Sequence, residues 1–129
     1  MERKSKKEEA LEWGRMGEQI TCEYLATQGH TVTERNWRCG SRLEIDIIST
    51  QGDEIVFIEV KTRNGKFGKA EDAIDEKKIK QIVKAANIYM QQLDRPYCAR
   101  FDVALIEGTP DSYDFTYIRD AFVPPLSAR

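Results

Sequence analysis

The chain has 129 residues, and its hydrophobic residues (40%) and charged residues (33%) occur in the proportions of a soluble globular protein. This length predicts one domain over residues 1–129 with its own core, and flexible tails at 1–8 and 123–129. No apolar run approaches the roughly 18 residues of a membrane span, and the charged first residues exclude a signal peptide. A net charge of −2 excludes the strongly basic class of nucleic-acid-binding proteins.

The cysteines indicate the compartment. Cys22, Cys39 and Cys98 lie far apart, and His30 is the only histidine. An odd number of widely spaced cysteines is typical of reduced thiols, so we expect a cytoplasmic protein. Without a CxxC pair, a zinc site is not expected.

The first half of the chain predicts a helix followed by three strands. Residues 9–28 have apolar residues at helical spacing, and Gly29 follows as a stop signal. Alternating or β-branched segments separated by turn residues then predict strands at 30–38, 42–50 and 54–62.

The second half predicts another helix and strand. A glycine-containing loop at 63–70 precedes a long amphipathic helix at 71–93. A strand is expected at 100–107, and 113–122 is a candidate for one more edge strand. The order αβββαβ predicts an α/β domain with a mixed central sheet flanked by helices.

Two charged residues interrupt the most apolar strand, EIVFIEVKTR (54–63). Burying a charge costs several kcal/mol unless something pairs with it. Side chains alternate along a strand, so Glu59 and Lys61 share the face of Phe57. The opposite face is apolar: Val56, Ile58 and Val60.

The preceding strand is divided in the same way. Its residues Glu44 and Asp46 are expected on one face together with Ile48. The other face is expected to be apolar, with Leu43, Ile45 and Ile47.

The turn between these strands predicts how they pair. If Gly52 and Asp53 form a two-residue hairpin turn, residues whose numbers sum to 105 face each other. This register matches the apolar faces, and it places Asp46 opposite Glu59 and Glu44 opposite Lys61.

Opposed hairpin residues have Cβ atoms about 4.5–5.5 Å apart, so Asp46 and Glu59 repel unless a proton or cation separates them. Mg²⁺ binds carboxylate oxygens and retains several waters. Lys61 could orient a metal-bound water or stabilise charge on a phosphate. The pattern therefore predicts a metal-dependent phosphodiesterase site. A structural ladder of cross-strand ion pairs is equally consistent with the spacing.

The segments LEIDII (43–48) and VFIEVKTR (56–63) resemble the core of the PD-(D/E)xK nuclease superfamily. The chain is most similar to the bacterial YraN-like family, and it also resembles archaeal Holliday-junction resolvases. Three further segments carry this resemblance, which covers roughly residues 12–107: GRMGEQITCEYLATQGHTVTERNWR (14–38), AIDEKKIKQIVKAA (73–86) and RFDVALIE (100–107).

The resemblance implies a restriction-endonuclease-like fold and a Mg²⁺- or Mn²⁺-dependent deoxyribonuclease of DNA repair or recombination. Lys61 would activate water. Leu43 stands where the family usually has glycine, which would crowd the access of substrate. The implied metal ligands are Glu18, Asp46, Glu59 and the main chain of Val60.

The residues around Glu18 on the helix allow a separate interpretation of this glutamate. Gly14, Gly17 and Thr21 surround it on the helix, so this surface would allow another backbone to approach closely. The partner could be a sheet or a sugar-phosphate chain. The alternative is an exposed glutamate beside glycines that only pack the helix.

Basic residues gather after the proposed site: residues 61–84 contain eight Lys or Arg against four Asp or Glu, a local charge of +4. Candidate DNA contacts are Arg63, Lys66 and Lys69 in the loop, and Lys77, Lys80 and Lys84 on one face of the second helix. Taken alone, the helical lysines are more typical of the solvated face of an amphipathic helix.

Three function classes follow. The leading one is a DNA endonuclease acting on DNA, with branched DNA among the candidate substrates; junction resolution would need a two-fold homodimer. The others are a nuclease-like DNA-binding module without activity and a scaffold that never contacts DNA. Asp102, within an alternating apolar strand, is expected to make a structural hydrogen bond to an arginine or a loop.

Overall fold

The computed structural model describes residues 3–65 and 74–123. Its elements follow the predicted order, with the edge strand present. They are α1 (Lys6–Thr27), β1 (Thr31–Cys39), β2 (Leu43–Gln51), β3 (Glu54–Arg63), α2 (Glu76–Gln91), β4 (Cys98–Thr109) and β5 (Ser112–Ile118).

The strands form one mixed sheet in the order β1-β2-β3-β4-β5. Strands β3 and β4 are parallel, because α2 lies in the connection between them and returns the chain to the same end of the sheet. The other neighbours are antiparallel. The predicted α/β class with a mixed sheet is confirmed.

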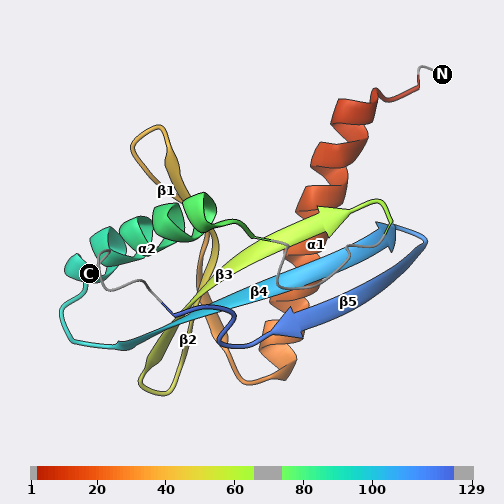
Figure 1. Cartoon of the computed structure of the whole chain (residues 1–129). Coiled ribbons are helices and arrows are strands. Elements are labelled where there is room, and N and C mark those ends of the chain that lie inside the picture. Colours follow the sequence, from red (N-terminus) through yellow and green to blue (C-terminus); the bar gives the residue numbers. More distant parts are fainter. Residues whose placement is uncertain (1–2, 66–73, 124–129) are drawn as a thin grey trace.

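The two helices cover opposite faces of the sheet (Figure 1). Helix α2 packs through Ile82, Val83 and Ala86 on the face that carries Phe57. On the other face, α1 packs through Trp13 and Leu25 against residues of three strands, which are Ile47, Val56, Ile58, Ala104 and Ile106. Strand β3 is therefore buried from both sides.

Both helices begin at a capping residue rather than where their apolar periodicity begins. Ser5 accepts the Glu8 N–H at 3.1 Å, so α1 begins three residues before the predicted start. Asp75 caps α2 by accepting the Lys78 N–H at 2.8 Å. The predicted start of the second helix at residue 71 was therefore wrong, and residues 66–73 lie outside the described part of the chain.

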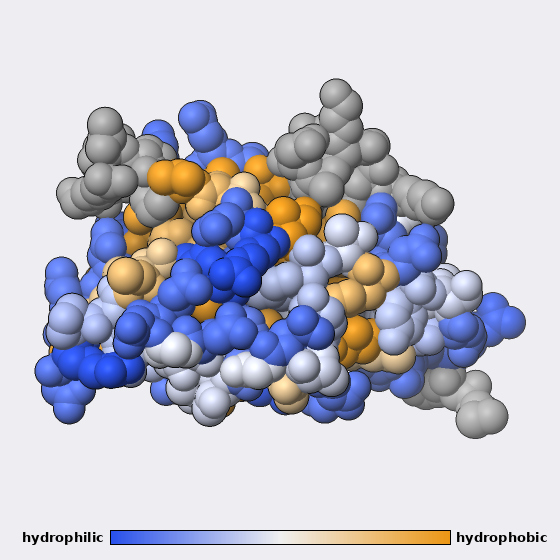
Figure 2. Space-filling view, turned by 90° about the horizontal axis from the view of Figure 1, so that it is seen from below, coloured by the Kyte–Doolittle hydropathy of each residue, from blue (hydrophilic) through white to orange (hydrophobic). Residues whose placement is uncertain are grey.

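The face of the molecule seen from below in Figure 2 is largely polar. Hydrophilic residues cover most of the face seen in Figure 2, with smaller groups of hydrophobic residues between them. Within residues 3–65 and 74–123, neither helix is long and apolar enough to cross a membrane.

Helix α1 packs closely against the sheet at Gly17, where it contacts side chains of strands β3 and β4, so this glycine serves the packing of the helix. A Cβ atom on Gly17 would overlap the Cγ2 methyl of Thr62 and would lie 3.3 Å from Ile106 Cδ1. The small side chain at this position lets α1 lie against β3.

Replacing Gly17 with alanine is expected to lower the free energy of unfolding by about 1–3 kcal/mol, because the β-branched Thr62 cannot easily move aside. Gly14→Ala is the matched control. Its nearest neighbour would be Thr62 Oγ1 at 3.9 Å, so alanine should stabilise the helix there. Urea denaturation of both variants measures the difference; equal effects would contradict the close contact at Gly17.

Candidate functional site

The candidate site lies where strands β2 and β3 separate. Their pairing runs from Gln51↔Glu54 to Ile47↔Ile58, which confirms the predicted turn and register. The ladder does not continue to Asp46. Instead, Asp46 Oδ2 accepts the main-chain N–H of Val60 at 2.8 Å. The carboxylate of one strand thus takes the place of a main-chain acceptor for the other strand.

Strand β2 changes faces at Asp46. Ile45 packs with the α2 cluster, whereas Ile47 packs with the α1 cluster. On the other side of β2, the pairing with β1 omits Asn36, whose φ of 52° lies in the left-handed region. The prediction that Leu43, Ile45 and Ile47 share one face was therefore wrong.

The predicted pairing of Glu44 with Lys61 was also wrong. Because strand β2 changes faces at Asp46, the side chain of Glu44 pairs with a residue of strand β1. Its carboxylate lies 3.5 Å from the guanidinium of Arg38, on strand β1.

Glu59 is the most buried charged residue of the site, with 6% of its side chain exposed. Its Oε1 lies 3.7 Å from the Nζ atoms of both Lys61 and Lys78. Burial raises the pKa of Glu59 to about 7, the charge of Asp46 adds to this rise, and the two lysines oppose it. The structure thus places Lys61 beside Glu59, as predicted.

Asp46 is affected in the same direction. Burial raises the pKa of Asp46 above its ordinary value, and the Val60 N–H opposes this rise by stabilising the carboxylate. The charge of Glu44 raises the pKa of Asp46 further. A buried carboxylate and a partly buried one, whose charged forms are both disfavoured, are a chemical environment that attracts a cation or a proton.

The raised pKa of Glu59 predicts how stability depends on pH. The folded state binds a proton up to about pH 7, whereas the unfolded chain releases it near pH 4.5. Without metal, the contribution of Glu59 should therefore lower the free energy of unfolding by up to about 3 kcal/mol as pH rises from 4.5 to 7. The measurement is the difference between wild type and Glu59→Gln across this pH range; a constant difference would contradict the shift.

Glu18 faces the same region from helix α1. When the side-chain amide nitrogen of Asn36 faces the two glutamates, it donates to Glu18 Oε2 at 2.8 Å and to Glu44 Oε1 at 3.2 Å. Burial raises the pKa of Glu18, and the charge of Asp46 raises it further. Glu18 is therefore electrostatically coupled to the site, as a neighbour that Asn36 holds in place.

The donor atoms fit a cation held by two carboxylates. In the described ranges 3–65 and 74–123, no three His, Cys, Asp or Glu side chains come together closely enough to enclose a metal ion. Mg²⁺ commonly binds one or two carboxylates and completes its shell with water and phosphate oxygens. Asp46 and Glu59, each with a raised pKa, are the two carboxylates that would form such a donor set.

Comparison with known proteins places the chain in a family. The model of "Uncharacterised protein family UPF0102" matches residues 17–106, which include Glu18, Asp46, Glu59 and Lys61. The chain belongs to the UPF0102 family. The predicted similarity to the YraN-like family is thereby confirmed.

Relatives in this family match over most of their length. A UPF0102 protein of Bacteroides thetaiotaomicron is 41% identical over 89% of this chain and 95% of its own. A UPF0102 protein of Phocaeicola vulgatus is 36% identical over the same shares. One from Hahella chejuensis is 40% identical over 88% of this chain and 91% of its own.

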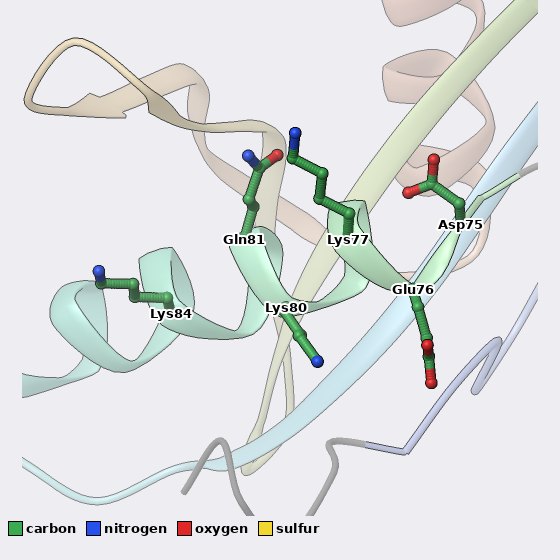
Figure 3. Close-up of a pocket in the computed structure, with 6 residues that line it drawn as sticks. All are labelled: Asp75, Glu76, Lys77, Lys80, Gln81 and Lys84. Carbon is green, nitrogen blue, oxygen red and sulfur yellow. The ribbon is translucent and has the colours of Figure 1, made fainter.

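The predicted DNA-binding residues of this UPF0102 chain lie in two places, on helix α2 and at and after the end of strand β3. Lys77, Lys80 and Lys84 line a shallow depression of about 610 Å³ along α2, together with Asp75, Glu76 and Gln81. Lys77 and Lys84 point to one side of the helix, whereas Lys80 points to the other (Figure 3). Arg63 ends strand β3 and donates to the Thr62 carbonyl at 2.8 Å. Lys66 and Lys69 lie outside the described residues.

Lys78 is the site residue that the sequence reasoning missed. It was counted only among the basic residues after the site, yet it reaches Glu59. A signal was present: Lys78 is four residues before Ile82 and seven before Ala85, so it continues the buried stripe of α2 toward its first turn. A lysine on the apolar side of a helix that covers Glu59 is a candidate partner for that carboxylate.

Asp102 has the structural role that was predicted. It accepts hydrogen bonds from the guanidinium of Arg100 at 2.9 and 3.0 Å, and from the main-chain N–H of Asp120 at 3.0 Å. The Tyr117 hydroxyl also donates to it. Arg100 and Asp102 are both almost completely buried, 2% and 1% exposed. They lie in the face of β4 that α1 covers, so they are not part of the candidate site.

Proposed function

We propose that this protein is a metal-dependent DNA endonuclease with the restriction-endonuclease-like fold of the PD-(D/E)xK superfamily. The observation that supports this proposal is the pair of carboxylates at the point where the β2–β3 ladder ends, of which Glu59 is buried and Asp46 is partly buried. Lys61 follows two residues later on the same strand. The αβββαβ order around a mixed sheet is compatible with that fold.

Each residue then has a specific part in the proposed reaction. A bound Mg²⁺ or Mn²⁺ would polarise the phosphate and lower the pKa of a water molecule. Asp46 and Glu59 would hold the metal, with Asp46 oriented by the Val60 N–H; the Val60 carbonyl is a further proposed ligand. Lys61 would orient the attacking water and stabilise negative charge on the phosphate.

Glu18 would act from the other side of Asp46. Its carboxylate, held by Asn36, would bind a water of the metal shell or enter the shell directly. The basic residues Arg63, Lys77, Lys80 and Lys84 would contact the DNA backbone, as would Lys66 and Lys69. Cleavage of branched DNA at two strands would require a two-fold homodimer that presents two sites.

The test is cleavage of a panel of linear, nicked, flap and four-way-junction DNAs by purified protein. Each DNA is incubated with Mg²⁺, with Mn²⁺ and with chelator. We expect cleavage with either metal and none with chelator. Glu59→Gln serves as the matched inactive control, because cleavage by both proteins would indicate a contaminating nuclease.

A second candidate is a DNA-binding module of the same fold without catalytic activity. It is favoured by the two lysines on Glu59, because the ammonium groups of Lys61 and Lys78 balance the charges of Asp46 and Glu59 when both carboxylates are ionised. Such a cluster is balanced without a metal ion. Binding of the DNA panel without cleavage by any metal would support this candidate.

Asp46→Asn separates a metal site from a structural ion-pair ladder. Asparagine can still accept the Val60 N–H, but it removes the charge that raises the pKa of Glu59. We expect the variant to melt about 2–5 °C above wild type in metal-free buffer and to lose the stabilisation that Mg²⁺ gives wild type. A melting temperature below that of wild type, with no effect of Mg²⁺ on either protein, would favour the structural ladder.

A further inference from the structure

Two ammonium groups compete for one oxygen of a buried carboxylate. Lys61 and Lys78 each place Nζ 3.7 Å from Glu59 Oε1. Lys61 comes from the strand of Glu59 itself, whereas Lys78 comes from the first turn of α2 on the neighbouring layer. Because Glu59 is so deeply buried, its ionised form requires positive charge at this position.

The two lysines differ in how easily their side chains can move away from Glu59. Two residues of extended chain span about 6.6 Å, so Lys61 is held near Glu59 by the strand that carries both. Lys78 is held only through its main chain, whose N–H is bound by Asp75. Its side chain is 34% exposed, compared with 21% for Lys61, so Lys78 has the easier path into water.

We propose, on the basis of the nuclease function above, that Lys78 is an internal counter-ion that occupies the cation position of Glu59 in the metal-free protein and is displaced by the divalent metal. A divalent ion binds a carboxylate oxygen at about 2.0–2.1 Å. An ammonium on the same oxygen would repel it. Lys78 is therefore a positioning residue that stabilises the empty site and sets the metal concentration at which it fills.

The test uses the full chain, Mn²⁺ alone as the probe, and calorimetry with thermal melting as readouts. Lys78→Met removes the charge and keeps the length of the side chain. We expect its Mn²⁺ affinity to rise about tenfold, because the competing cation is gone. We expect its metal-free melting temperature to fall by about 5 °C, and saturating Mn²⁺ to abolish this difference.

Two further variants keep the test decisive. Lys78→Arg retains the charge and binds carboxylates through two N–H groups, so its Mn²⁺ affinity should fall several-fold below wild type. This variant answers the question even if Lys78→Met does not fold. Lys7→Met, an exposed lysine on α1, is the matched control and should leave both readouts unchanged.

The outcomes separate this inference from the proposed function. If Lys78→Met binds Mn²⁺ no more tightly than wild type while wild type cleaves DNA, the counter-ion role is overturned and the nuclease stands. If the affinity rises but no DNA is cleaved, the counter-ion role is supported and the nuclease is not. If Mn²⁺ binds neither wild type nor the variants, both proposals fail.

Discussion

Replacing Lys61 with alanine is expected to lower the rate of DNA cleavage about 10²–10³-fold, the usual effect of removing one group that stabilises transition-state charge. The Lys61 ammonium lies 3.7 Å from Glu59 Oε1, and both residues belong to strand β3. Because its proposed contact forms with the developing charge, kcat and kcat/KM should fall together. Single-turnover cleavage at saturating Mg²⁺ measures the loss.

The controls for Lys61→Ala test folding and binding separately. Lys7→Ala removes an exposed lysine from α1 and should cleave at the wild-type rate. The affinity of Lys61→Ala for DNA in the presence of Ca²⁺ should remain close to that of wild type, because the backbone contacts are assigned to other residues. Wild-type cleavage by Lys61→Ala would remove this lysine from the mechanism.

Replacing Asp102 with alanine is expected to lower the free energy of unfolding by about 3–5 kcal/mol, whatever the function of the protein. The change removes the carboxylate that the almost fully buried guanidinium of Arg100 contacts at 2.9 Å and leaves Glu54 as its remaining acidic partner. The Tyr117 hydroxyl and the Asp120 N–H also lose their acceptor. Urea denaturation at pH 7 measures the loss.

Two comparisons test whether the loss comes from the buried charge of Arg100, which then keeps only its contact with the partly exposed Glu54. Asp111→Ala removes an exposed acid from the turn between β4 and β5 and should change stability by less than about 0.5 kcal/mol. The double variant Arg100→Met/Asp102→Leu should recover part of the loss, since both charges are gone. If the double variant is less stable than Asp102→Ala, burial of the arginine is not the cause.

The order of the elements and the pairing of β2 with β3 could be predicted from the amino-acid sequence. Both predictions depend on local information, namely the turn at Gly52 and the alternation of apolar residues in the strands on either side of it. The same alternation correctly separated Glu59 from the apolar face of β3. The sequence also indicated that another element could pack closely on α1 at Gly17, because glycine has no side chain.

The arrangement of the charges in the site could not be predicted in this way, because it depends on contacts between separate elements. The change of face at Asp46 depends on a side chain that binds the main chain of the neighbouring strand, which alternation along one strand cannot show. Lys78 reaches Glu59 because α2 crosses that face of the sheet, and the crossover sets which turn of the helix meets the carboxylate. Long-range contacts of this kind depend on the packing of separate elements, whereas periodicity depends only on neighbours along the chain.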